Sequence, residues 1–323
     1  MKPGLLLAAL LPAFSAVGDE LPVLRRSFSE PASPVPPFPD GRFEPRCGET
    51  LAWIGGTEVH ELDRHGLVEA GLHLAWPDRA LRWRNLAWQG DTVHVQARPL
   101  HYYTERGDTQ PGSIPDSRER TEPGVVFLAF GKMESLEGIG RLPRFVKAYG
   151  SLLDDLAALT PRLVLVEPPP FFESGPAAAL AGPRNGVLAE YVSAIADLAA
   201  ERGLFFLRHG AVEWTAAMSD NGVHLNAAGH RAWADALLAR LGGGKGDPSA
   251  ALLDAVARKN LFWQQYYRPT NWAFLFGDRQ HVPASRDVEK REERWFVREI
   301  DALPALLAEA ERDLHRYAKE AAR

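Results

Sequence analysis

Two short segments combine residue types that could support nucleophilic catalysis. The first is Gly55-Gly56-Thr57, which follows an apolar run and precedes a segment with helical spacing. The second is a turn-forming segment that carries His224 just ahead of another helical segment. A hydroxyl becomes a nucleophile when a general base lies within hydrogen-bond reach. The two segments therefore suggest a hydroxyl–imidazole pair, with Asp220 or Asn221 available to orient the imidazole.

Both candidates also have a structural interpretation. A threonine at the start of a helix often caps it, here together with Glu58, and on the turn alone this is the commoner role. A histidine in a loop is usually structural or simply exposed. The catalytic hypothesis therefore depends on whether other segments bring Thr57 and His224 together.

Hydrophobic patterning predicts the elements that would do so. Apolar runs that end in turn formers alternate with helical patterns, which indicates a parallel sheet covered on both sides. Parallel strands present their carboxyl ends at one sheet edge, where open α/β sheets bind ligands. The predicted strands span residues 51–55, 80–87, 124–131, 162–167 and 204–208, and the predicted helices span residues 58–76, 142–159, 186–202 and 227–241, the last capped by Asn226. A long polar loop is expected at residues 97–123.

Four blocks at this predicted edge carry a family resemblance. They are Gly55-Gly56-Thr57, Gly90, Gly131-Lys132-Met133-Glu134 and Asn221-Gly222-Val223-His224. In order and spacing they resemble the blocks of the SGNH (GDSL-type) hydrolases. The resemblance covers about residues 50–242 and implies a flavodoxin-like three-layer α/β/α domain with a five-stranded parallel sheet.

The resemblance also implies roles for individual residues. Thr57 stands at the nucleophile position and His224 at the base, with Asp220 or Asn221 to orient it. The remaining positions belong to the oxyanion hole and its surroundings: Gly56, Gly90, Gly131, Met133 and Glu134. The implied activity is hydrolysis of an ester bond, such as an acyl group on a carbohydrate, without a metal ion or other cofactor.

Several of these positions depart from the family pattern. Thr57 replaces the usual serine, Met133 the usual oxyanion asparagine, and Asn221 the usual orienting aspartate. Gly56 also stands where the family has an aspartate. A second hypothesis follows, in which the chain is a catalytically inactive member that binds a glycan or protein partner.

Beyond residue 247 the pattern becomes helical and aromatic. Residues 248–323 are expected to form a helical extension that docks on the α/β domain, with residues 268–271 connecting its parts. The aromatic residues between 262 and 276 could bind carbohydrate, although such runs are more often core. With the extension, the chain resembles a planctomycete-type group of the family. An apolar stripe with helical spacing runs through Phe296, Ile300, Leu303, Leu307, Ala310, Leu314 and Tyr317, on one helix or across a break at Pro304.

Composition limits the alternatives. The chain has 323 residues, of which 46% are apolar, and a net charge of −5, so no basic field indicates nucleic-acid binding.

Residues 1–18 have the pattern of a signal peptide and predict a secreted or periplasmic protein. A proline-rich linker is expected at residues 19–46 and the hydrolase-like domain at residues 47–242. No later segment is apolar for long enough to cross a membrane. Cys47 is the single cysteine, which excludes an intramolecular disulfide.

Residues 60–65 offer a rival metal site. His60 and Glu61 begin an HExxH-like pattern, but Arg64 stands where the second histidine is required. His65 and Glu69 fall four residues apart on a helix, a spacing more common on a solvated face than in a metal site.

Overall fold

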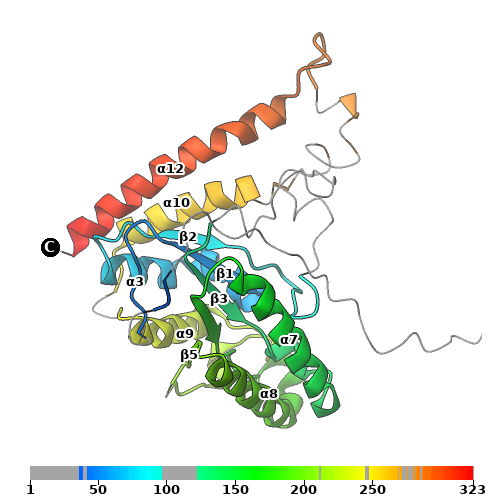
Figure 1. The fold of residues 1–323 in the computed structure, drawn as a ribbon. Helices are drawn as coiled ribbons and strands as arrows, with labels where there is room; N and C mark the ends of the chain where they lie inside the picture. Colours follow the sequence, from blue (N-terminus) through cyan, green and yellow to red (C-terminus); the bar gives the residue numbers. More distant parts are fainter. Residues whose placement is uncertain are drawn as a thin grey trace, which may run out of the picture.

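The computed structural model describes residues 36–38, 42–96, 122–210, 212–243, 247–267, 269–270, 274, 279, 281–283 and 286–322. A five-stranded parallel sheet with strand order β2-β1-β3-β4-β5 lies at its centre. The strands are β1 (Thr50–Gly55), β2 (Arg82–Asn85), β3 (Val125–Ala129), β4 (Leu163–Val166) and β5 (Phe205–Leu207). This order and the helices on both faces confirm the flavodoxin-like three-layer fold (Figure 1).

Alternate residues of the strands supply two separate cores. One face of the sheet packs against α3 (Leu67–Ala75) and α9 (Ala227–Arg240), with Trp53 and Trp233 both fully buried. The other face packs against α7 (Leu142–Ala157) and α8 (Ala181–Glu201), with Ile54 and Tyr149 in its core. Strands buried on both faces need apolar residues at every position, which explains the unbroken apolar runs in the sequence.

The predicted helix over residues 58–76 is divided into three. These are α1 (Thr57–His60), α2 (Leu62–His65) and α3. The chain ends α2 at Gly66, whose φ of 64° is left-handed and suits glycine. A Cβ at Gly66 would also lie 2.9 Å from the Val256 side chain, so the glycine lets the extension approach closely.

The remaining elements follow the predicted pattern with shifted boundaries. Asn226 caps α9 as expected, because its side chain accepts hydrogen bonds from the backbone N–H groups of Ala228 and Gly229. The predicted helix at 186–202 begins earlier, at Ala181. Short helices complete the described fold: α6 (Lys132–Ser135), η3 (Ile139–Arg141), η4 (Gly175–Leu180) and η5 (Ala216–Met218).

Part of the proline-rich segment lies along the amino-terminal edge of the sheet. Arg162 donates hydrogen bonds to the carbonyl oxygens of Pro36 (2.7 Å) and Glu44 (3.2 Å), and its guanidinium lies over the Phe38 ring. Phe43 is buried against the core. The described part of the proline-rich segment therefore packs against the surface of the domain. The expected signal peptide at 1–18 and almost all of the expected loop at 97–123 lie outside the described residues.

The extension forms two long helices, α10 (Ala250–Tyr267) and α12 (Trp295–Ala321), which lie side by side (Figure 1). The apolar stripe of α12 runs along a single helix that continues through Pro304. A small core of Ala70 from α3, Leu252 and Val256 from α10, and Leu314 and Ala318 from α12 joins the extension to the domain. The expected docking is therefore observed. None of the described helices has both the length and the hydropathy to cross a bilayer.

Candidate active site

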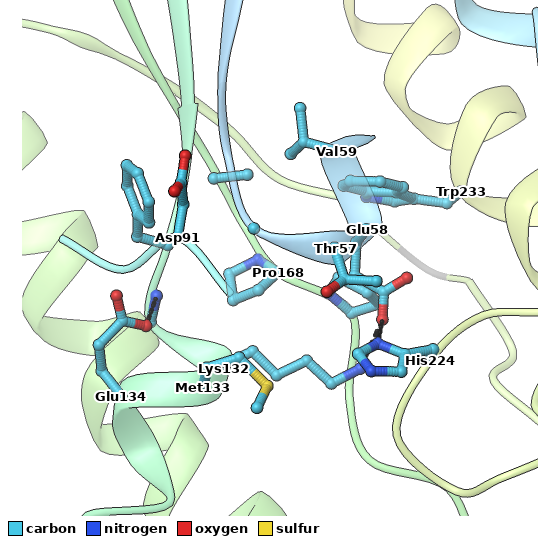
Figure 2. Close-up of a pocket in the computed structure, with 15 residues that line it drawn as sticks. Thr57, Glu58, Val59, Asp91, Lys132, Met133, Glu134, Pro168, His224 and Trp233 are labelled. Carbon is cyan, nitrogen blue, oxygen red and sulfur yellow. Dashed lines mark hydrogen bonds and ion pairs between the residues drawn. The ribbon is translucent and has the colours of Figure 1, made fainter. Parts of the chain in front are cut away.

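A small cavity lies at the carboxyl edge of the sheet. Its volume is about 30 Å³, which is room for about one or two water molecules. The segments that follow four of the strands contribute to its wall, together with the loop before α9. Figure 2 shows the side chains grouped around it. Those that matter for the chemistry are Thr57, Glu58, Asp91, Lys132, Met133 and His224.

Thr57 is the first residue of α1 and lines this cavity. The helix cap itself is Gly56, in extended conformation, and no side chain caps the helix. The structure therefore does not support the capping interpretation of Thr57. The two preceding glycines permit close packing: a Cβ at Gly55 would lie 2.6 Å from the Val59 side chain, and one at Gly56 would lie 3.1 Å from the Asp91 carbonyl oxygen.

His224 lines the same cavity, and Glu58 holds its ring. Nδ1 of His224 lies 3.3 Å from Oε1 of Glu58 (Figure 2). A carboxylate only accepts hydrogen bonds, so Nδ1 must carry the proton and donate it. In the neutral ring, Nε2 is then the nitrogen that carries the free lone pair. Glu58 Oε2 also accepts a hydrogen bond from the backbone N–H of Leu225 (3.2 Å), which fixes the histidine loop.

Asp220 and Asn221 have other contacts, contrary to the expectation that one of them orients the imidazole. Asp220 accepts a hydrogen bond from the Asn226 side chain (2.9 Å). Asn221 Oδ1 accepts from the backbone N–H groups of Val223 (2.9 Å) and His224 (2.8 Å). Both side chains thus shape the turn that presents the histidine. Among the described contacts, the carboxylate that meets the His224 ring is that of Glu58.

Glu58 is buried among cationic and imidazole groups. The ammonium of Lys132 lies 3.2 Å from Oε1, and Nε2 of His230 lies 4.0 Å from Oε2. Burial alone would raise the pKa of Glu58, but the hydrogen bond with His224 and the charge of Lys132 outweigh it and hold the pKa below its usual value. Glu58 is therefore ionised at neutral pH, as an orienting carboxylate must be.

Met133 and Glu134 stand at the family's oxyanion block and have different surroundings. Met133 lines the cavity and is 38% exposed, so a thioether stands where the resemblance implies an amide donor. Glu134 serves the scaffold: its carboxylate accepts hydrogen bonds from the backbone N–H groups of Val93 (2.7 Å) and Gly131 (2.8 Å). Burial raises the pKa of Glu134 despite these bonds. The Gly131 amide is thereby occupied by a structural contact.

Gly90 lies further from the cavity than the sequence suggested. It is exposed in a turn, with a left-handed φ of 84°, and does not line the cavity, whereas its neighbour Asp91 does. Thr57 begins the first turn of α1 and lines the cavity. Of the two residues expected to supply backbone donors, only Thr57 lines this cavity.

Sequence reasoning missed Glu58 and Lys132 as site residues. Glu58 was interpreted as part of a helix cap because it directly follows Thr57. Lys132 occupied a position of the third block at which the resemblance implies no particular side chain. The sequence signal for the pair is that acidic Glu58 follows β1 and basic Lys132 follows the neighbouring strand β3. Acidic and basic residues are common at a solvent-exposed sheet edge, so this signal is weak.

The rival sites take structural roles. His60 pairs with Glu61 (3.2 Å), and the His65 ring stacks on His230 with ring centroids 4.4 Å apart. Glu69 is buried and pairs with Lys259 (2.7 Å). Within the described residues, no group of acidic, histidine or cysteine side chains is arranged to hold a metal ion.

Fold and site together define a three-layer α/β protein with a hydroxyl, an imidazole and a carboxylate around one cavity. The chain belongs to the GDSL-like lipase/acylhydrolase family, a family of hydrolases that cleave ester bonds, because the family model matches residues 64–232, just over half of the 323 residues. The matched region includes His224 and begins after Thr57.

Several solved structures are similar to this chain at low sequence identity. A putative GDSL-like lipase from Parabacteroides merdae is 16% identical, with a TM-score of 0.48 over 62% of this chain and 99% of that chain. Axe2, an acetylxylan esterase from Geobacillus stearothermophilus, is 20% identical, with a TM-score of 0.46 over 61% of this chain and 95% of that chain. LAE5, an alpha/beta hydrolase enzyme from the metagenome of Lake Arreo, is 18% identical, with a TM-score of 0.46 over 62% and 98%. No curated protein sequence matches the chain.

Proposed function

We propose that the protein hydrolyses an ester bond with Thr57 as nucleophile, His224 as general base and Glu58 as the carboxylate that orients the base. The observation that carries this proposal is the contact of 3.3 Å between Glu58 Oε1 and His224 Nδ1, beside a cavity that Thr57 also lines. Glu58 thus replaces Asp220 and Asn221 in the expected catalytic set.

The reaction would follow the covalent course of acyl transfer. Oγ1 of Thr57 attacks the ester carbonyl carbon while Nε2 of His224 takes its proton. The tetrahedral intermediate collapses, the C–O bond to the alcohol breaks, and the alcohol leaves with the proton from His224. A water molecule then attacks the acyl-threonine, again with His224 as base, and releases the carboxylic acid and free Thr57.

Two features reduce the expected rate. The threonine methyl group restricts χ1 and crowds the approach of the carbonyl. Met133 supplies no donor for the oxyanion, and loss of one such donor typically costs about 10² to 10³ in turnover. The backbone N–H of Thr57 is the donor that would support the oxyanion here, whereas Gly90 does not line the cavity. A short acyl group suits the small cavity, and an acylated carbohydrate is the substrate class carried from the family resemblance.

Hydrolysis of p-nitrophenyl acetate by the purified protein tests the proposal. Thr57→Ala and His224→Ala should each abolish turnover while the protein remains folded by circular dichroism. Thr215→Ala and His281→Ala change exposed residues away from the cavity and should retain wild-type activity. Activity that persists in both Thr57→Ala and His224→Ala would exclude this mechanism.

A second candidate function is binding without turnover, as an inactive member of the family. Thr57, Met133 and Asn221 support it because each departs from the family pattern at a functional position. The cavity and the histidine loop would then serve to hold a glycan or protein partner. Absence of hydrolysis in the wild type, with hydrolysis created by restoring the family residues, would favour this reading.

A further inference from the structure

Lys132 is a buried lysine whose amine points into the candidate active site. It begins α6 directly after Gly131, lines the cavity, and is 5% exposed. Lysine is almost never fully buried unless it is paired, because desolvation of the ammonium is costly. Burial lowers the pKa of Lys132, and the neighbouring Glu58 opposes this effect. Such a residue needs an explanation beyond packing.

The contacts of its ammonium join three segments of the site. It donates to Oε1 of Glu58 at 3.2 Å, the same oxygen that holds His224. It also donates to the backbone carbonyl of Val223, the residue before the histidine. Its remaining surroundings are the faces of Phe171 and Phe172, 5.3 and 5.6 Å from the ammonium. Figure 2 shows the side chain reaching from α6 toward Glu58 and His224.

We propose that Lys132 is a positioning residue of the hydrolytic site, whose buried ammonium keeps Glu58 ionised and aimed at His224 and holds the histidine loop through Val223. This inference rests on the proposed function, because it concerns the same catalytic set. Lys132 acts through Glu58 and does not itself act as the base, since both Glu58 and the Val223 carbonyl already engage its amine.

Electrostatics indicate why the site needs this cation. Glu58 is buried, and burial favours its protonated form, which could not accept a hydrogen bond from His224 in the same way. The groups that oppose protonation are His224 on its loop, Lys132 on α6 and His230 on α9. The pKa of His230 is about 4, so this ring is neutral at physiological pH. Among the described residues, Lys132 is the lysine or arginine that pairs with Glu58, at 3.2 Å.

The test replaces the cation while retaining the shape of the side chain. Lys132→Met removes the charge, Lys132→Gln removes the charge but retains a donor for Val223, and Lys132→Arg retains the charge. We expect both uncharged variants to lose kcat about tenfold at pH 8 and about 100-fold at pH 6, because Glu58 then takes up a proton at higher pH. KM should change little, and Lys132→Arg should recover part of kcat.

A double-variant cycle distinguishes positioning from general support of the fold. If Lys132 acts through Glu58, the Glu58→Gln/Lys132→Gln double variant should be no slower than Glu58→Gln alone. Multiplicative losses in the double variant, or an equal loss at pH 6 and pH 8 in Lys132→Gln, would overturn the proposal. If Lys132→Met does not fold, the Gln variant and the cycle still decide the question.

A readout without turnover separates this inference from the proposed function. The ¹⁵N signals of the His224 ring should report a proton fixed on Nδ1 in the wild type between pH 6 and 8. In Lys132→Gln, the preference of the proton for Nδ1 should weaken toward pH 6. In Lys132→Arg, the same preference should persist. If the wild type is inactive but the ¹⁵N signals behave in this way, the proposed hydrolytic function is refuted and the positioning role of Lys132 toward His224 stands. A His224 tautomer that is insensitive to Lys132→Gln would refute the role of Lys132 whatever the activity.

Discussion

Glu58 connects the turn that carries Thr57 with the loop that carries His224. In the proposed mechanism, one short helix, α1, supplies both the attacking hydroxyl of Thr57 and the carboxylate of Glu58 that orients His224. The turn before α9 is then free to use Asp220 and Asn221 for its own hydrogen bonds. Both segments line the cavity, and Glu58 joins them by its contacts with His224 and Leu225.

Restoring the family residues should raise the rate of ester hydrolysis. Thr57→Ser removes the crowding methyl group, and Met133→Asn can supply an amide donor to the oxyanion. We expect the double variant to turn over p-nitrophenyl acetate about 10² to 10³ times faster than the wild type, the typical value of one oxyanion donor. Leu136→Asn, an exposed residue one turn from Met133, is the matched control. An unchanged rate in the double variant would show that these two departures do not limit the chemistry.

His230 should make the protein sensitive to acid. Its ring is 1% exposed, neither ring nitrogen has a hydrogen bond among the described residues, and burial lowers its pKa from 6.5 to about 4. Between these values the unfolded chain binds a proton that the folded state resists, so stability is complete above pH 6.5 and falls as the pH drops toward 4. The shift corresponds to roughly 3 kcal/mol of unfolding free energy.

Urea unfolding at pH 7 and pH 4.5 measures this contribution. His230→Leu should flatten the pH dependence and cost little at pH 7, because an unsatisfied buried polar ring is replaced by an apolar side chain. Glu58, His65, Glu61 and Arg64 also act on the ring, and they remain in the variant. His281→Gln changes an exposed histidine and should keep the wild-type pH dependence. The same slope in His230→Leu as in wild type would contradict the assignment.

Helices α10 and α12 are attached to the domain by buried polar contacts as well as apolar ones. Lys259 of α10 lies 2.7 Å from the Glu69 carboxylate of α3, and Asn260 donates to the same carboxylate at 2.9 Å. Trp263 donates to the carbonyl oxygen of Asn85 at the end of β2 (3.0 Å). The Asn85 side chain donates in turn to the carbonyl of Val59 in α1 (2.7 Å). The extension therefore supports the helix that carries Thr57 through β2.

Breaking the Lys259–Glu69 pair should destabilise the protein strongly. Lys259→Met leaves a buried carboxylate without its cation, which typically costs about 3 to 5 kcal/mol. The double variant Glu69→Leu/Lys259→Met should recover much of this loss, because two apolar side chains replace the pair. Asp154→Asn removes an exposed pair with Arg202 and should cost less than about 1 kcal/mol. Urea unfolding gives the values, and a Lys259→Met variant as stable as Asp154→Asn would contradict this account.

On the scale of the whole molecule, the candidate active-site cavity and the extension lie at different places. None of the residues that line the cavity belongs to α10 or α12, whereas both helices pack on α3 (Figure 1). The described part of the extension therefore does not line the candidate active-site cavity. The carbohydrate-binding interpretation of the aromatic segment gains no support from Trp263, which is buried against the domain.

Truncation after Gly244 tests how far the domain depends on the extension. Removing α10 and α12 exposes Ala70 and leaves Glu69 without Lys259. We expect unfolding free energy to drop by more than about 3 kcal/mol, with a corresponding loss of soluble protein. Circular dichroism and urea unfolding measure the change. A truncated chain that is as soluble and stable as the full chain would show that the extension is dispensable for the fold.

The sequence alone determined the sheet domain, the cap of α9 and the apolar stripe of α12. These features depend on residues that are close in the sequence. The period of the apolar residues distinguishes strands from helices, and Asn226 accepts its hydrogen bonds from residues two and three positions ahead. The family blocks likewise indicated which strand ends would form the cavity. Only tertiary structure decided which side chains meet there. Glu58 contacts Lys132 across 74 residues and His224 across 166, and Lys259 reaches Glu69 from a helix beyond the domain. Such contacts depend on how helices pack and which charges are buried together, and neither a spacing nor a propensity encodes them.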